Sequence, residues 1–136
     1  MDLGKTLAIA AAGLRVQGER MRVIAENMAN ADSGAAAPGQ DPFRRKTVLF
    51  ANVLDEASGL ELVRVVGETF DDSDFERRFD PGHPSADADG YVLLPNVNPI
   101  LEMTDMRQAL RSYEANLAVI EVAKAMLQKT IDLLRG

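Results

Sequence analysis

Apolar residues recur alternately at every third and fourth position through the last quarter of the chain, residues 98–134. This is the spacing of the a and d positions of a helix whose apolar line faces another helix. Residues 100–135 contain no proline or glycine, so nothing in the sequence interrupts such a helix. We therefore expect one long C-terminal helix with an apolar line made of Met103, Met106, Leu110, Tyr113, Leu117, Ile120, Leu127, Ile131 and Leu134.

The N-terminal part of the chain repeats this spacing and supplies a partner. A helix of roughly 30 residues is about 45 Å long, more than a small globule can cover. The N-terminal helix, with Asp2 as its cap, carries a first apolar line made of Leu3, Leu7, Leu14, Met21, Ile24 and Met28. A second line on a flanking face, made of Ile9, Val16 and Val23, indicates more than one neighbour. We expect that a single subunit cannot cover this second line.

The middle of the chain predicts a small β insert between the helices. A loop rich in Gly, Ala and Pro precedes short runs of β-branched and aromatic residues with polar flanks. These runs, at residues 43–54, 60–70 and 75–79, predict a hairpin or a three-stranded sheet that needs the helices for stability. The four prolines that follow predict that residues 80–99 run extended and kinked.

The predicted fold class is mainly α with a small β insert, and the two terminal helices pack together as a coiled coil. Inside the N-terminal helix, Gly13 and Gly18 indicate close approach of neighbouring backbones. The expected divisions are an N-terminal helix at residues 1–31, a linker loop at 32–42, a β-rich or extended insert at 43–99 and a C-terminal helix at 100–136.

Composition narrows the possible partners. The net charge of −6 and the absence of a Lys/Arg cluster argue against nucleic acid and anionic lipid as partners. The chain has no cysteine, which excludes disulfides, thiolate metal sites and cysteine nucleophiles. No apolar run approaches the roughly 18 residues that a membrane span needs. Asp2 stands where a signal peptide would be basic, so we expect any export to proceed without a cleaved signal peptide.

The run Asp87-Ala88-Asp89-Gly90 superficially resembles a calcium loop. In an EF-hand the position two before Asp87 is acidic or Asn, and the twelfth position is Glu. Ser85 and Asn96 stand at these two positions, so an Asp-Gly turn is the better interpretation.

Other residues with chemical potential do not form a site in the sequence. His83 is the only histidine, and a turn histidine bonded to backbone is favoured over a ligand or a base. Asp71, Asp72 and Asp74 are interpreted as a solvated turn. We expect no catalytic residue, no cofactor and no metal site.

A series of motifs in the second half of the chain resembles the flagellar basal-body rod proteins, and most closely their proximal rod subunits. The N-terminal half agrees through the end of its helix, residues 25–31, and through residues 43–46. Departures are the Ala/Gly/Pro-rich stretch after Asp32, the poorly matching residues 52–76, and Glu114 in place of Gln. The residues that carry the resemblance are Asp80, Pro81, Gly82, His83, Pro84, Asp87, Asp89, Gly90, Tyr91, Pro95, Asn96, Asn98, Glu102, Met103, Asp105, Met106, Arg111, Ser112, Tyr113 and Asn116.

The resemblance implies a structural protein without catalysis. Such subunits are exported unfolded through the flagellar type III apparatus and assemble helically, through their terminal helices, into the rod that crosses the periplasm and transmits motor torque. The implied partners are other copies of the chain, other rod subunits and the proteins of the junction between the rod and the MS ring. Two alternatives stay open at this point: a stand-alone coiled-coil adaptor and a small calcium-binding regulator.

Overall fold

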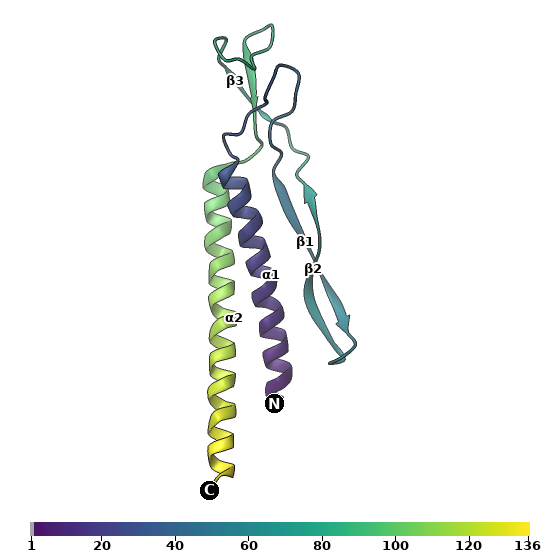
Figure 1. Ribbon diagram of the computed structural model, residues 1–136, viewed down its shortest axis with the longest axis vertical. Coiled ribbons are helices and arrows are strands. Elements are labelled where there is room, and N and C mark those ends of the chain that lie inside the picture. Colours follow the sequence, from purple (N-terminus) through teal and green to yellow (C-terminus); the bar gives the residue numbers. More distant parts are fainter. Residues whose placement is uncertain (1) are drawn as a thin grey trace.

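A computed structural model describes residues 2–136, and Met1, the first residue of the predicted N-terminal helical segment, lies outside the described residues. Two long helices enclose four strands in the chain order (Figure 1). The predicted combination of long terminal helices and a small β insert is confirmed. The elements are α1 Leu3–Ala29, β1 Lys46–Asp55, β2 Leu60–Phe70, β3 Glu76–Phe79, β4 Tyr91–Leu94 and α2 Pro99–Leu134.

Both helices begin where a side chain satisfies free backbone N–H groups. Asp2 Oδ1 accepts from Lys5 N at 3.2 Å, as predicted for the first helix. Asn98 Oδ1 accepts from Ile100 N at 3.0 Å, and Pro99 follows in the first turn of α2, where its missing N–H costs nothing. The helices contain 27 and 36 residues, so the prediction of two long terminal helices is confirmed.

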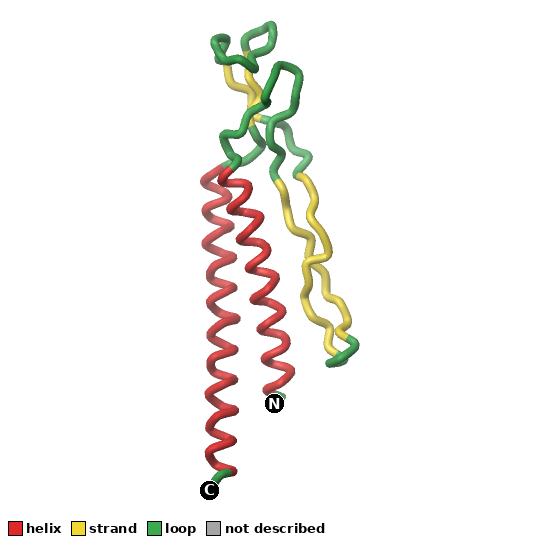
Figure 2. Tube along the Cα trace, viewed as in Figure 1, coloured by secondary structure: helices red, strands yellow, loops and turns green. Residues whose placement is uncertain are grey.

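The two helices run antiparallel and side by side (Figures 1 and 2). Arg20 Nη2 donates to Gln108 Oε1 at 3.0 Å, and Gly13 lies against Asn116 farther along the pair. Near the start of α1, Leu3 lies beside residues 118–126 of α2. The C-terminal turns of α2 continue beyond the start of α1 (Figure 1).

The face that α2 turns toward α1 includes only part of the predicted apolar line. The buried residues of α2 are Glu102, Ala109 and Ala123. With Asn116, which lies against Gly13, they follow one another at seven-residue spacing on one face of the helix. These positions lie next to the predicted line and carry small or polar side chains, which allow the two backbones to approach closely. The predicted coiled-coil packing through the whole a/d line of α2 is therefore not confirmed within the subunit: Met106, Tyr113 and Ile120 are partly buried, and the other large members are exposed. The exposed members are Met103, Leu110, Leu117, Leu127, Ile131 and Leu134.

The β1–β2 hairpin covers the side of α1 that faces away from α2 (Figure 1). It is antiparallel, with a bulge after Leu49 where the register shifts. Val16 and Val23 are 4% and 2% exposed, so the expectation that a single subunit cannot cover this line is wrong for them. Ile9, the third member, lies nearer the free end of α1 and is 54% exposed. The two apolar faces of α1 therefore reflect two neighbours inside the same chain.

The second hairpin, β3 with β4, forms a separate two-stranded sheet near the end of the molecule where α1 ends and α2 begins (Figure 2). Of the two expected arrangements, the hairpin is present as β1 with β2, and the third strand does not join it to make a three-stranded sheet but pairs with β4. The segment 80–99, expected to be only extended and kinked, contributes β4, which pairs from Tyr91 to Leu94 with the preceding strand. Its earlier part forms turns, and residues 32–42 form a loop as predicted.

Candidate functional site

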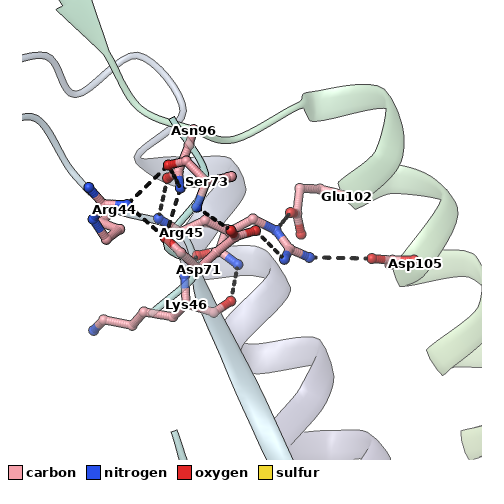
Figure 3. A network of polar contacts seen from close by, with 9 residues as sticks. Arg44, Arg45, Lys46, Asp71, Ser73, Asn96, Glu102 and Asp105 are labelled. Atoms are coloured by element: carbon pink, nitrogen blue, oxygen red, sulfur yellow. Dashed lines mark hydrogen bonds and ion pairs between the residues drawn. The ribbon is translucent and has the colours of Figure 1, made fainter. Parts of the chain in front are cut away.

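A network of polar side chains joins α2 to the entrance of the β1–β2 hairpin (Figure 3). At its centre, Arg45 Nε donates to Glu102 Oε1, whose side chain is only 1% exposed. The other guanidinium nitrogens of Arg45 face Asp71 Oδ2 at 3.3 Å and Asp105 Oδ2 at 3.6 Å. One arginine therefore connects three carboxylates that come from two distant parts of the chain. We call this set of residues, with Asn27 and Asn96 described next, the polar junction.

The side-chain amides of Asn27 and Asn96 complete the polar junction, because each bonds to backbone N–H and C=O groups as a neighbouring strand would. Asn27 of α1 donates from Nδ2 to Lys46 O at 2.8 Å and accepts from Lys46 N at 2.9 Å. Asn96 accepts from Arg45 N at 2.7 Å and donates to Asp71 O at 2.9 Å. These paired bonds fix the first residues of β1 against α1 and against the segment that leads into α2, because each amide satisfies both a donor and an acceptor.

The charges of the polar junction stabilise one another. Burial alone would lower the pKa of Arg45, but hydrogen bonds and charge from Glu102 and Asp71 offset this and raise the pKa above its ordinary value. The backbone N–H and the side chain of Ser73, and then Arg45, hold the pKa of Asp71 below its ordinary value. Both groups are therefore held in their charged forms around neutral pH, and the ion pairs persist there.

The sequence anticipates these residues only in part. Asn96, Glu102 and Asp105 belong to the motifs that carry the family resemblance, and the structure brings them together. The contact of Asp71 with Arg45 corrects the interpretation of Asp71 as part of a solvated turn. The only available signal is the position of an acidic residue directly after a strand, which does not reveal a partner far away in the sequence.

The loop between β3 and β4 uses its polar residues to hold its own backbone. His83 Nδ1 accepts from Ser85 N at 3.0 Å, which is the backbone-bonded turn histidine that the sequence favours. Asp87 Oδ1 accepts from both Asp89 N and Tyr91 N at 2.9 Å. Across residues 2–136, no group of three or more His, Cys, Asp or Glu side chains is placed to hold a metal ion.

Aromatic and proline contacts support the same loop. Phe79 and Tyr91 meet edge to face with ring centroids 5.3 Å apart, and the Arg77 guanidinium lies over the Tyr91 ring. Gly90 has a φ of +84°, and a Cβ there would come within 3.1 Å of Pro81 Cβ, so both conformation and space require glycine. The loop is also tied to the 32–42 loop, because Ser85 Oγ donates to Ala35 O at 2.6 Å. The motif residues in and beside this loop are Asp80, Pro81, Gly82, His83, Pro84, Asp87, Asp89, Gly90 and Tyr91.

The residues predicted to form an assembly interface fall into two groups in the structure. On α1, Ile24 is buried together with Val16 and Val23, and the members that are partly buried are Leu3, Leu7, Leu14, Met21 and Met28. On α2, Met106, Tyr113 and Ile120 are partly buried. The remaining members of the C-terminal line are 37–83% exposed, so the subunit presents a row of large apolar side chains along its longest element.

An apolar groove lies on the other flank of α2. It has a volume of about 310 Å³ and lies between the first turns of α1 and the C-terminal half of α2. Its lining includes Leu3, Val119, Val122 and Met126 and is almost entirely apolar. Large apolar surfaces of this kind on both flanks of one helix are typical of sites that contact other proteins.

The remaining motif residues lie along α2 and at its start. Asn98 caps the helix, and Pro95 just before it is among the most deeply buried side chains. Asn116 Nδ2 donates to Ser112 O at 2.9 Å while its amide packs on Gly13. Arg111 is exposed. No helix in the described part of the chain combines the length and the hydropathy needed to cross a membrane.

Comparison with known proteins identifies the family. Residues 88–133 match the family model described as the flagellar basal body rod FlgEFG protein C-terminal region. The chain is 51% identical to the flagellar basal-body rod protein FlgC of Agrobacterium fabrum, over 94% of this chain and 92% of the relative. It is 40% identical to FlgC of Salmonella typhimurium over 98% of each chain, and 38% identical to FlgC of Bacillus subtilis over 94% of this chain and 95% of the relative. The chain therefore belongs to the FlgC family of flagellar basal-body rod proteins.

Proposed function

We propose that the protein is a structural subunit of the proximal rod of the bacterial flagellar basal body. The observation that carries this proposal is the row of large apolar side chains exposed along α2 in a chain that matches rod proteins over nearly its whole length. The exposed fractions of Leu110, Leu117 and Ile131 are 44%, 40% and 49%. All three lie on one side of α2, so they form a continuous apolar surface. A subunit whose role is to pack against neighbours has a reason to keep such side chains uncovered.

The proposed assembly is helical. We propose that the exposed row on α2 packs against a different surface of a neighbouring copy, so that contacts between copies are heterologous. Heterologous contacts that do not close into a ring generate a filament with all subunits pointing the same way. The terminal helices then form its packed layer, with the predicted a/d residues of α2 buried between subunits and the hairpins farther from that layer.

Torque transmission requires that a subunit not bend where its parts join. The polar junction supports this requirement, because Arg45 ties the start of β1 to the start of α2 through Glu102. Asn27 adds a third element by holding β1 on α1. We propose that this junction keeps the hairpin, the β3–β4 unit and the helix pair in one fixed arrangement under load.

The proposed partners are other copies of this chain, other rod subunits and the proteins of the junction between the rod and the MS ring. The proposed location is the basal body, in the rod that crosses the periplasm, after export in an unfolded state without a cleaved signal peptide. The absence of cysteine supports this route, since refolding after export then needs no disulfide formation. We propose no catalytic role and no cofactor.

The test is a Leu117→Asp substitution in cells whose own copy of the gene has been deleted. We expect normal synthesis and export, no completed rods in purified basal bodies, and loss of swimming, because a carboxylate would be buried between subunits. Glu121→Ala, an exposed polar position on the same helix, serves as the matched control and should swim normally. Normal rods with Leu117→Asp would overturn the proposal. If the purified wild-type chain instead formed a discrete, fully helical dimer, the coiled-coil adaptor would become the better account.

A further inference from the structure

Ser85 joins the loop between β3 and β4 to the loop that follows α1. Its hydroxyl oxygen donates to Ala35 O at 2.6 Å, and this hydrogen bond is buried. Ser85 is 7% exposed and Ala35 is 9% exposed, so bulk water does not readily replace either partner. The contact therefore fixes the β3–β4 unit on the segment that leaves the helix pair.

The position of Ser85 depends on His83, two residues earlier. His83 Nδ1 accepts from Ser85 N at 3.0 Å. A ring nitrogen that accepts a hydrogen bond carries no proton, so the proton of the neutral imidazole is on Nε2. Turns on both sides hold the backbone of His83, because its N donates to Asp80 O at 3.1 Å and its O accepts from Ala86 N at 3.0 Å. His83 itself is exposed, so protons reach it from solvent.

Protonation of His83 Nδ1 is incompatible with this hydrogen bond. Nδ1 then becomes a donor, and two N–H groups face each other. If the ring turns away instead, the Ser85 N–H is left without an acceptor in a buried residue, which is costly. Both results disfavour the closed contact. Histidine is the side chain that changes charge between about pH 5 and pH 8, so the conflict arises in mild acid.

A cavity of about 200 Å³ beside His83 shows which charges surround the ring. Its charged lining side chains are Asp32 from the loop after α1, Arg78 from β3 and Asp80 from the turn that follows, whereas β4 contributes only apolar side chains. Asp87, in the same loop as the ring, already accepts from two backbone N–H groups. Two carboxylates against one guanidinium leave the cavity negative, so the charged groups beside the ring do not oppose its protonation.

We propose that His83, Ser85 and Ala35 form a proton-sensitive latch. It holds the β3–β4 loop on the loop after α1 while His83 is neutral, and it opens when Nδ1 takes up a proton. The contact is lost as the pH falls, because the closed form excludes the proton that the open form binds. Over the roughly two pH units in which a histidine titrates, the ratio of open to closed latch should rise by about tenfold. All the groups belong to one subunit, so the latch does not depend on the proposed rod role.

The test measures the exposure of residue 35 by thiol labelling, for which a chain without cysteine gives no background. Ala35→Cys keeps the backbone carbonyl that accepts from Ser85. Its rate of reaction with a small maleimide is measured at about pH 7.5 and about pH 5.5. Each rate is divided by that of the urea-unfolded chain at the same pH, which removes the titration of the thiol itself. We expect the normalised rate to be about tenfold higher at the lower pH.

Two further variants, each made in the Ala35→Cys chain, identify the latch as the cause. His83→Asn is the matched control, since the side-chain oxygen of Asn accepts from a backbone N–H two residues on and does not titrate. Its normalised rate should be equal at the two pH values. Ser85→Ala removes the bond to Ala35 O and should give the higher rate at both.

A second readout uses the unmodified chain. Hydrogen exchange at Ser85 N, corrected for the intrinsic rate at each pH, should accelerate by the same factor, and NMR of the His83 ring should show an unprotonated Nδ1 at the higher pH. Equal normalised rates at the two pH values, the same rise in His83→Asn, or a proton on Nδ1 of the neutral ring would overturn the inference. A loss of helical circular dichroism at the lower pH would also overturn it, because the whole fold and not the latch would then open.

Discussion

Gly13 of α1 lies directly against the side-chain amide of Asn116 in α2, so that a Cβ at position 13 would come within 2.8 Å of Asn116 Nδ2 and Oδ1. This contact explains why glycine, a poor helix former, stands in the middle of α1: any larger side chain at position 13 would collide with Asn116. A Cβ at Gly18, five residues later, would meet no other atom of the chain within 4 Å. The sequence indicates close approach of a neighbouring backbone at both glycines, but the structure places a side chain against Gly13 and no other part of the described chain against Gly18.

The first prediction compares the two glycines. Gly18→Ala should raise the free energy of unfolding by about 0.5–1 kcal/mol, because alanine restricts the unfolded chain and is the better helix former. Gly13→Leu should lower it by about 1–3 kcal/mol, because the added side chain forces the helices apart. Urea unfolding followed by circular dichroism measures both. A stabilisation by Gly13→Leu as large as that by Gly18→Ala would show that α1 and α2 do not pack closely at Gly13.

The second prediction concerns the polar junction. Arg45→Met should lower the free energy of unfolding by about 3 kcal/mol, because it leaves the Glu102 carboxylate buried without its cationic partner. Adding Glu102→Gln should recover part of this loss, since a neutral amide is cheaper to bury. Lys46→Met, next in the chain, removes a more exposed pair with Glu26 and should cost at most about 1 kcal/mol. Similar losses for both methionine variants would contradict the assigned role of Arg45.

The sequence locates the helices and strands of this protein better than it predicts which face of each helix packs against which neighbour. The start of α1 follows from the Asp2 cap and the length of α2 from its uninterrupted apolar periodicity, whereas the Asn98 cap of α2 is seen only in the structure. The same periodicity cannot say which partner covers which line. The row that contains Leu117 is as regular as a buried seam, but small residues such as Ala109 pack on α1 instead, because close backbone contact favours them.

Some residues of the candidate site can be identified from the sequence, but the sequence does not show that they lie together in the fold. Asn96, Glu102 and Asp105 stand out through the family resemblance, yet their convergence on Arg45 depends on the path of the chain through β1 and β2. Pairing between Arg45 and Asp71 arises because the two residues flank the open end of a long hairpin, where Asp71 N also donates to Arg45 O at 2.8 Å. Hairpin register is a long-range property that neither residue signals alone.

The third prediction tests the covered line on α1. Val23→Ala should lower the free energy of unfolding by about 2 kcal/mol, because Val23 is 2% exposed beneath the hairpin and its loss leaves a cavity. Ile9→Ala, in the same line but 54% exposed, should change it by no more than about 0.5 kcal/mol. The purified chains are compared by urea unfolding. A loss at Ile9 equal to that at Val23 would mean that the hairpin extends its cover farther along α1 than its contacts indicate.

The last prediction is a loss of stability in acid that depends on Asp71. Hydrogen bonds from Ser73, and then the charge of Arg45, hold the pKa of the folded Asp71 below its ordinary value of 3.8. The unfolded chain therefore takes up a proton at this residue more readily than the folded chain. The stabilisation from Asp71 is fully present above the unfolded pKa and is lost as the pH falls through the lower folded pKa.

Urea unfolding between about pH 5 and pH 2 should accordingly show stability falling with pH in the wild type and falling less steeply in Asp71→Asn. Asp74→Asn, an exposed acid three residues later that makes no ion pair with a described side chain, is the matched control and should keep the wild-type slope. A residual slope is expected in Asp71→Asn, because hydrogen bonds from Ser58 also lower the pKa of Asp55 at the far end of the hairpin. Identical slopes in all three proteins would mean that Asp71 gains nothing from Ser73 and Arg45 on folding, and that the polar junction is not held by charge on that side.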